Sequence, residues 1–420
     1  MRKTMRLRHA LGGLFLVSAG LLAQAPVAAA ATPDPVPLLK SRGCDTLTGR
    51  VAALEGPAVL LPSYDPPPAD PALAGAAFTY DNALAVLALL ACDAVPEARR
   101  VGEALRRATV SDRVAPPLGR LRNAYRAGPQ PETPPPHGWW DATRQAWLED
   151  DTQVGTATGN VAWAGLALVA LGEATHDPGF TAAAAQLGQW IMTHTQDTKG
   201  PGGFTGGVHG NDQGAQRLTW KSTEHAIDAE ALFRRLLAVG APGPWAKGRD
   251  HARAFVQALW DEPSGHFLTG TTPDGVTPNT GSSGLDAQLW AQLLPEAPPA
   301  WARALDYART AHGVPGGYAF NNDRAGLWTE GTAQAALALA VRGRPANAEM
   351  ASVAAQISPT GYLWATPEER LSTGLALGPA STTADFFYYK IPHLGATAWA
   401  VLAATRWNPF TGQALTVGSR

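Results

Sequence analysis

Cysteine, net charge and long apolar runs are all scarce in this chain of 420 residues. The two cysteines, Cys44 and Cys92, form no Cys/His cluster with zinc spacing, so we expect neither a metal site nor a cofactor. The formal net charge of -2 gives no electrostatic reason to expect a nucleic acid or an anionic membrane surface as a partner. After the N-terminal segment, no apolar run is long enough to span a bilayer.

The N-terminus has the pattern of a secretion signal. Arg2, Lys3, Arg6 and Arg8 precede an apolar stretch at 11–22, and four alanines at 28–31 offer small residues for cleavage. We therefore expect residues 1–31 to be a signal peptide and the mature chain to be secreted or periplasmic, with no membrane insertion after cleavage. In an oxidising compartment the two cysteines either form a disulfide or remain as two buried thiols.

Six segments are rich in alanine and leucine, low in charge and helical in period, which is typical of helices buried on all sides. They are NALAVLALLAC from Asn82, NVAWAGLALVALG from Asn160, HAIDAEALFRRLLAVG from His225, DAQLWAQLL from Asp286, GTAQAALALAV from Gly331 and LGATAWAVLAATRW from Leu394.

More amphipathic helices with charged faces lie between these segments. They begin near Pro96, Asp177, Trp245, Pro299 and Ala346. Buried helices that alternate with amphipathic ones predict an all-α protein, an (α/α)6 barrel in which an inner ring of six helices is surrounded by an outer ring. We expect one domain over 32–420, with long loops at 129–136 and 200–214.

Polar and aromatic residues precede or begin each of the six apolar segments. Because the inner helices of such a barrel run in one direction, these residues should meet at one end. The set is Tyr80, Asp81, Thr158, Asn160, Trp220, Lys221, Thr223, Glu224, His225, Asp228, Ser283, Asp286, Trp328, Glu330, Tyr389, Lys390 and His393.

Helix capping is the alternative explanation for each of these residues taken singly, because Asp, Ser, Thr and Asn are preferred at helix N-termini. We assign Asn160 and Ser283 to caps. Capping does not require Glu224 beside His225, or tryptophans flanking the acids, so we interpret the remaining set as a site.

Paired carboxylates suit glycoside hydrolysis, in which one acid protonates the leaving oxygen and the other activates water or attacks carbon. The candidate catalytic residues are Asp81, Glu224, Asp286 and Glu330. Glu330 beside Trp328 and Glu224 near Trp220 fit the proton donor, whose pKa must be raised, whereas Asp81 or Asp286 suits the base.

Sugars stack their apolar faces on aromatic rings, and their hydroxyls need polar partners. The candidate substrate-binding residues are Tyr80, Trp139, Trp140, Trp220, Lys221, His225, Asp228, Trp328, Tyr389 and His393. We place Trp139, Trp140, Trp220, Trp328 and Trp364 in loops, while Trp163, Trp290 and Trp399 lie within the apolar helices and are assigned to the core.

The segments TYDNALAVLALL, TGNVAWAGLAL, KSTEHAID, LDAQLWA, WTEGTAQ and PHLGATAW resemble the starts of the inner helices in the six-hairpin glycosidase-like superfamily. The resemblance covers about 79–410. It implies hydrolysis of a glycan, usually with inversion, and a role in bacterial exopolysaccharide or cell-surface glycan metabolism.

Three functions remain open. The first is an exported glycoside hydrolase whose partner is a poly- or oligosaccharide. The second is a polysaccharide lyase on the same barrel, in which His225, Tyr389 or Tyr80 acts on a uronate and Arg217 or Lys221 neutralises its carboxylate. The third is a glycan-binding protein without catalysis. A sugar epimerase is disfavoured by the export signal, and one scaffold hosts several chemistries.

Overall fold

The structure is a computed structural model that describes residues 34–113, 120–379, 383 and 386–416. The expected signal peptide lies outside the described residues. Contacts place the chain from Asp34 onward in one compact unit. Within the described residues, no helix combines the length and the apolar character needed to cross a membrane.

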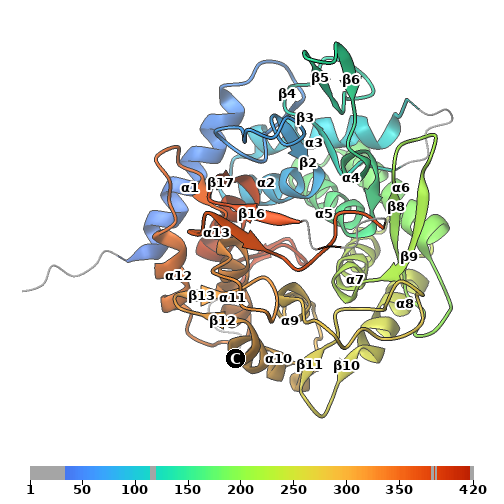
Figure 1. Cartoon of the computed structure of the whole chain (residues 1–420), viewed down its shortest axis with the longest axis vertical. Coiled ribbons are helices and arrows are strands. Elements are labelled where there is room, and N and C mark those ends of the chain that lie inside the picture. Colours follow the sequence, from blue (N-terminus) through green and yellow to red (C-terminus); the bar gives the residue numbers. More distant parts are fainter. Residues whose placement is uncertain (1–33, 114–119, 380–382, 384–385, 417–420) are drawn as a thin grey trace, which may run out of the picture. The chain divides into compact units, whose positions relative to one another are not determined.

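Six buried helices form a closed inner ring, as Figure 1 shows. Each helix packs against the next, and the last packs against the first. They are α2 (Thr79–Ala91), α5 (Thr158–Thr175), α7 (Thr223–Ala238), α9 (Leu285–Trp290), α11 (Thr329–Val341) and α13 (Leu394–Thr405). Alanine on every face lets these helices approach closely, and nearly every residue of α2, α11 and α13 is buried.

An outer ring of helices surrounds the inner ring. It consists of α1 (Pro35–Ala52), α3 (Val95–Val110), α6 (Pro178–Trp190), α8 (Trp245–Ala258), α10 (Arg303–His312) and α12 (Asn347–Ala354). A short helix, α4 (Asp151–Val154), precedes α5, a π-helical turn (Ile191–Thr195) follows α6, and a 3-10 turn (Pro299–Ala302) precedes α10. The alternation confirms the predicted barrel.

Helix α1 is the outer helix that the sequence pattern did not reveal. Its buried stripe is Leu39, Gly43, Leu47 and Val51, so a glycine interrupts the apolar spacing. A Cβ on Gly43 would lie 2.4 Å from the Val401 side chain of α13. The glycine therefore allows α1 to pack closely on the inner ring.

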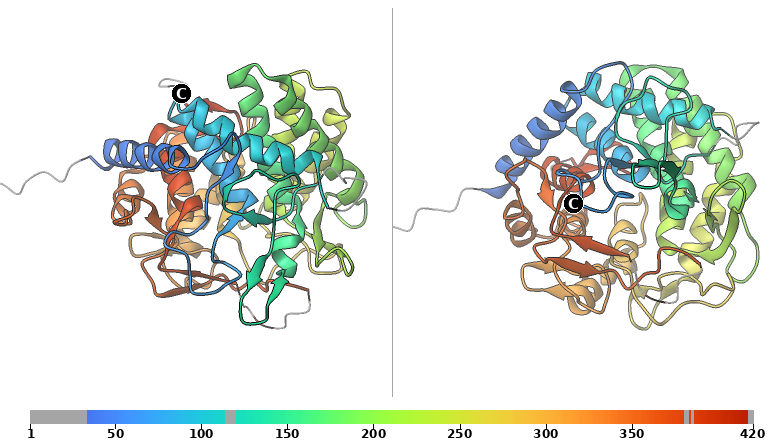
Figure 2. Two further views of the ribbon diagram at one scale, coloured as in Figure 1. Left: turned by 90° about the horizontal axis from the view of Figure 1, so that it is seen from above. Right: turned by 45° about the horizontal axis from the view of Figure 1, so that its top comes forward.

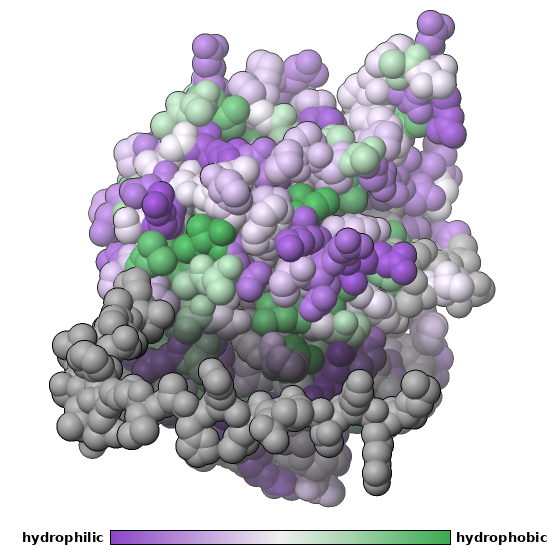
Figure 3. Space-filling model, turned by 60° about the vertical axis from the view of Figure 1, so that its left-hand side comes forward, coloured by the Kyte–Doolittle hydropathy of each residue, from purple (hydrophilic) through white to green (hydrophobic). Residues whose placement is uncertain are grey.

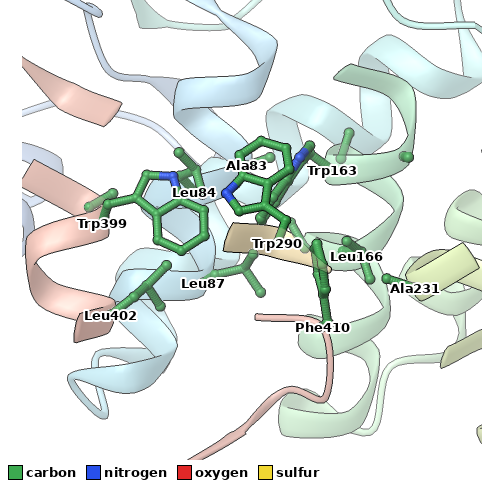
Figure 4. Packing of buried hydrophobic residues seen from close by; sticks show 14 of the residues in the cluster. Ala83, Leu84, Leu87, Trp163, Leu166, Ala231, Trp290, Trp399, Leu402 and Phe410 are labelled. Atoms are coloured by element: carbon green, nitrogen blue, oxygen red, sulfur yellow. The ribbon is translucent and has the colours of Figure 1, made fainter. Parts of the chain in front are cut away.

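Aromatic rings from the inner helices fill the interior of the barrel, as Figure 4 shows. The rings of Trp163 and Trp290 lie 5.1 Å apart, and Trp399 lies 5.6 Å from Trp163. Phe410, which follows α13, packs against Trp163 at 5.4 Å and closes this cluster. All four residues are buried, as was expected of the three tryptophans.

The strands are short and antiparallel. They form two-stranded sheets, with one three-stranded sheet of β7, β8 and β9. In the left view of Figure 2 the longer loops and hairpins gather on one side of the helices. The strands are β1 (Val59–Leu60), β2 (Ala76–Phe78), β3 (Ala124–Arg126), β4 (Gly128–Pro129), β5 (Trp139–Asp141), β6 (Ala146–Leu148), β7 (Thr156–Ala157), β8 (Thr205–His209), β9 (Gln216–Lys221), β10 (Trp260–Asp261), β11 (His266–Phe267), β12 (Gly313–Val314), β13 (Gly317–Tyr318), β14 (Leu363–Trp364), β15 (Arg370–Ser372), β16 (Phe387–Tyr389), β17 (Pro392–His393), β18 (Trp407–Asn408) and β19 (Gln413–Ala414).

These strands correct several loop assignments. Trp139 and Trp140 lie in β5, Trp220 in β9 and Trp364 in β14. The glycine-rich stretch 200–214 contains β8 rather than a continuous loop. The reason is that a strand of two to six residues carries too little alternation to be recognised from sequence.

A disulfide joins Cys44 of α1 to Cys92 at the end of α2. It connects the first outer helix to the first inner helix across 48 residues.

On the face in Figure 3, hydrophilic and hydrophobic residues are interspersed in small groups over the coloured surface.

Candidate active site

Backbone hydrogen bonds hold the starts of the inner helices around one end of the barrel, here called the mouth. The first N–H of an inner helix donates to a carbonyl in the segment that leads into the next inner helix, which satisfies a donor that the helix itself leaves free. The bonds run from Thr79 to Asn123, Thr223 to Thr269, Leu285 to Phe320, Thr329 to Ala365 and Leu394 to Ser63, at 2.9 to 3.1 Å. The last bond returns to the segment before α2, so the set supports five of the six helix starts around the mouth. At the remaining start, that of α5, the Thr158 hydroxyl donates to the Thr205 carbonyl at 2.6 Å.

A cavity of about 610 Å³ lies at this mouth, within the size range of small-molecule sites. Four carboxyl groups line it together with aromatic rings. The lining includes Tyr80, Trp163, Trp220, Lys221, Glu224, His225, Asp228, Asp286, Trp290, Phe320, Trp328, Glu330, Leu375, Ala376, Phe386 and Tyr388.

Glu330, in the first turn of α11, is 1% exposed. Its Oε1 accepts a hydrogen bond from the Tyr80 hydroxyl at 2.8 Å, and that hydroxyl accepts one from the Trp399 indole N–H at 2.8 Å. Its Oε2 is buried without a hydrogen-bond partner. Burial raises the pKa of Glu330 to about 7, although the charge of His393 opposes the rise. Because Oε1 already accepts from Tyr80, Oε2 is the oxygen left to bind a proton.

A histidine and a second carboxylate lie behind Glu330. His393 Nε2 lies 3.3 Å from Asp81 Oδ2, and His393 Nδ1 lies 3.6 Å from Glu330 Oε2. Burial lowers the pKa of His393, but the carboxylates of Asp81 and Glu330 outweigh it and the net shift is upward. A Cβ on Gly395 would lie 2.8 Å from both Asp81 Oδ1 and Glu330 Oε2, so those oxygens are at most twice that distance apart.

The positions of Asp81 and His393 differ from the sequence interpretation. Both are buried and neither lines the cavity. His393 is the N-cap of α13, where its Nδ1 accepts from the Ala396 N–H at 3.3 Å. The helix alternation correctly predicts the end of the barrel at which Asp81 and His393 lie. It does not predict how deeply their side chains are buried, and both lie next to Glu330 without lining the cavity.

The other three carboxyl groups come from α7 and α9. Glu224 is half-buried, whereas Asp228 and Asp286 are 0% and 6% exposed. Burial raises the pKa of Glu224 to about 7. Burial, reinforced by the charge of Glu224, raises the pKa values of Asp228 and Asp286 well above their ordinary value.

Several buried polar atoms in this cavity have no partner within the protein. They include Oδ1 of Asp286 and the indole nitrogens of Trp290 and Trp328. Buried polar groups are normally hydrogen-bonded, so acceptors and donors left free in one cavity indicate a polar ligand. Trp163 and Trp290, assigned to the core from sequence, are buried there and also line the cavity.

Other predicted site residues are placed differently. Trp139, Trp140 and Tyr389 do not line the cavity, and Trp140 is 57% exposed on the β5–β6 hairpin. Lys221 lines it, but its ammonium donates to the Lys199 carbonyl at 2.7 Å.

The assignment of Asn160 and Ser283 to helix caps is wrong. The N-cap positions of α5 and α9 are Ala157 and Gly284. Asn160 lines the cavity and donates to the Asn123 side chain, and the Ser283 hydroxyl lies 3.0 Å from His312 Nε2.

Sequence reasoning missed the contribution of Phe320, Phe386 and Tyr388, which line the cavity beside Trp328. The aromatic run at 386–389 was a signal, but its connection to the cavity was not visible in the sequence. Within the described ranges, no cluster of three or more His, Cys, Asp or Glu side chains is arranged to hold a metal ion.

No protein-family model and no curated protein sequence matches the chain. Solved structures do. A glycosidase variant in complex with glucose has a TM-score of 0.61 at 13% identity, covering 90% of this chain and 99% of that one. A cellobiose 2-epimerase from Spirochaeta thermophila has a TM-score of 0.57 at 13% identity, covering 88% and 96%. A possible GH105 family member from Salmonella enterica has a TM-score of 0.52 at 16% identity, covering 94% and 98%. These likenesses confirm the fold, the six-hairpin (α/α)6 barrel.

Proposed function

We propose that the protein is an exported glycoside hydrolase that cleaves a poly- or oligosaccharide by general acid and base catalysis. The observation that carries the proposal is the environment of Glu330. Its side chain lines a cavity together with three further carboxyl groups, its Oε1 is held by Tyr80, its Oε2 has no hydrogen-bond partner, and burial raises its pKa to about 7. A carboxyl group that keeps its proton near neutral pH is what protonation of a glycosidic oxygen requires.

Glu330 is the proton donor in this proposal, and Glu224 is the base or nucleophile. Glu224 is half-buried and so has access to water, and its pKa of about 7 keeps the ionised form accessible near neutral pH. Asp228 and Asp286 are buried, and their pKa values, raised well above the ordinary value, disfavour the ionised form. The negative charge of Glu224 raises the pKa of Glu330, so ionisation of one group keeps the proton on the other.

The charge of the cavity favours an uncharged sugar over a uronate, and therefore a hydrolase over a lyase. Among the described lining residues the cation is Lys221, which is bonded to the Lys199 carbonyl and lies 3.8 Å from Asp197. Arg217 is exposed outside the lining and donates to the Gln196 carbonyl. A uronate carboxylate would therefore enter among four acids without a free cation to neutralise it.

The test is digestion of uncharged and uronate-containing polysaccharides, following new reducing ends and the ultraviolet absorbance of unsaturated uronates together. We expect reducing ends without absorbance. Glu330→Gln should abolish turnover while substrate binding remains, and azide should restore part of the activity of Glu224→Ala by replacing its carboxylate. Glu132→Gln, on an exposed loop, is the control and should remain active. Full activity of Glu330→Gln would remove Glu330 from the mechanism.

Export is part of the proposal and is supported by the N-terminal leader pattern together with the Cys44–Cys92 disulfide, since disulfides persist in oxidising compartments. Expression of the full chain in a bacterium, followed by sequencing of the mature N-terminus, tests it. Cleavage close to Ala31 and recovery outside the cytoplasm are expected. An intact N-terminus in the cytoplasmic fraction would contradict export.

A sugar epimerase is the second candidate. His225 lines the cavity, and burial lowers its pKa to about 4, so it is a neutral base at pH 7. A cellobiose 2-epimerase is also among the structures with the same fold. Chromatography of disaccharides after incubation separates the two functions, because an epimerase yields an isomer of unchanged mass and no new reducing ends.

A further inference from the structure

A segment of the chain, residues 373–379, crosses the barrel mouth, and we call it the strap. It follows β15, which pairs with β16. At its start the Thr373 carbonyl accepts from the Asn321 side-chain amide at 2.7 Å. At its far end the Leu377 carbonyl accepts from the Thr152 hydroxyl at 3.0 Å. A Cβ on Gly378 would lie 2.9 Å from the His209 imidazole, so the strap also packs on β8.

The two attachment points lie on opposite sides of the ring. Asn321 is in the segment before α11, and Thr152 is in α4, which precedes α5. The inner helices follow one another as α2, α5, α7, α9, α11 and α13, so α5 and α11 face each other across the barrel. In Figure 1 the chain near β16 extends over the centre of the helices toward β8.

The strap forms one wall of the cavity. Leu375 and Ala376, together with Phe386 hydrogen-bonded to Leu375, belong to the lining. Besides the strap, most of the lining comes from the segments that begin α5, α7, α9 and α11. The α2 and α13 side contributes Tyr80, Phe386 and Tyr388, whereas Asp81 and His393 do not belong to the lining. The strap and the aromatic residues at 386–388 therefore bound the cavity together on its α2–α13 side.

The floor of the cavity is closed as well. Trp163 and Trp290 line it from below, and Phe410 packs beneath them at 5.4 and 6.4 Å between ring centroids. A ligand therefore cannot continue through the barrel. With a strap on one side and aromatic rings below, the carboxyl groups are reached from the α7–α9 side.

From this geometry we infer that the cavity receives the end of a glycan chain, so that the enzyme removes terminal units and does not cleave within the chain. A polymer bound across the mouth would have to pass through the strap. The inference rests on the proposed function and deepens it by defining the substrate as a chain terminus.

The experiment is product analysis of the mature protein on whichever uncharged polysaccharide of the panel it hydrolyses, with oligosaccharides of that polymer labelled at the reducing end. In early digestion we expect one short product to predominate over all intermediate lengths, with little fall in viscosity. A ladder of internal fragments with a rapid fall in viscosity would overturn the inference while leaving hydrolysis intact. Reducing ends from no polymer at all would overturn the proposed function and this inference with it.

Two strap variants sharpen the test. Deletion of residues 375–378 removes the wall, and Thr152→Val removes one attachment while leaving the cavity lining unchanged. We expect both to raise the share of internal fragments, the deletion by more than Thr152→Val. Circular dichroism and thermal unfolding identify folded variants, and Thr152→Val serves if the deletion does not fold. An unchanged product pattern in a folded deletion variant would refute the strap as the barrier.

Discussion

Replacement of Glu330 by glutamine should make the protein more stable at alkaline pH, and the gain should vanish at acidic pH. Burial raises the pKa of Glu330 from 4.5 to about 7. A raised pKa means that the folded state holds the proton more tightly than the unfolded state. The contribution of Glu330 to stability is therefore fully present below its pKa in the unfolded state, and is lost as the pH rises from there through its pKa in the folded state.

The size of the effect follows from the shift itself. At about 1.36 kcal/mol per pKa unit, ionising Glu330 at pH 8 costs the folded state about 3 kcal/mol. Glutamine keeps the oxygen that accepts from Tyr80 and places a neutral amide where Oε2 carried its proton. The variant therefore resembles the protonated enzyme at every pH, and avoids that cost.

The assay is urea unfolding of wild-type protein and Glu330→Gln at several pH values from 4 to 8. We expect nearly equal free energies of unfolding at pH 4, an advantage for the variant that grows as the pH rises from 4.5 to about 7, and a constant advantage above that. Glu132→Gln, which changes an exposed side chain, should match wild-type protein throughout. A difference between Glu330→Gln and wild-type protein that does not change with pH would refute the assignment of a buried, proton-holding Glu330.

Three further outcomes are expected. Tyr80→Phe removes a hydrogen bond that favours the ionised form of Glu330, so the pKa of Glu330 should rise. The alkaline limb of the pH–rate profile should then move to higher pH by about one unit, and an unmoved limb would contradict this role of Tyr80. Replacing Cys44 and Cys92 by serine removes the disulfide that closes a loop of 48 residues, and should lower the free energy of unfolding in urea by about 4 kcal/mol. An unchanged unfolding midpoint would show that the disulfide does not form. Gly395→Ala should lower the free energy of unfolding by about 1 to 3 kcal/mol and should also lower turnover, because the new Cβ would lie 2.8 Å from buried carboxyl oxygens. Gly49→Ala is the control, because a Cβ at Gly49 meets no atom within 4 Å.

The inner ring was predictable because burial on all sides leaves a strong mark on composition. Segments such as those beginning at Asn82 and Gly331 are almost free of charge, and the alternation with amphipathic helices orders them in space. The direction of the inner helices then places Glu224, Asp286 and Glu330 at one end of the barrel, where the structure has them.

The depth at which each side chain is buried, and its position around the mouth, were not predictable from the sequence. Both depend on packing between segments that are distant in the chain. Asp81 and Glu330 both lie in the first turn of their helices, yet Asp81 contacts His393 and Glu330 lines the cavity. The strap has no helical or strand period, and its course depends on its contacts with Asn321 and Thr152, far away in the sequence.

The backbone hydrogen bonds around the mouth have a consequence for the evolution of this barrel. They join main-chain groups, which every residue other than proline supplies, so the support of the helix starts is indifferent to which side chains the loops carry. Loops can therefore be exchanged or lengthened by mutation while the first turns of the helices keep their positions. New specificities can arise on such a framework without rebuilding it, and this modularity offers a physical reason why chains only 13% identical share one architecture.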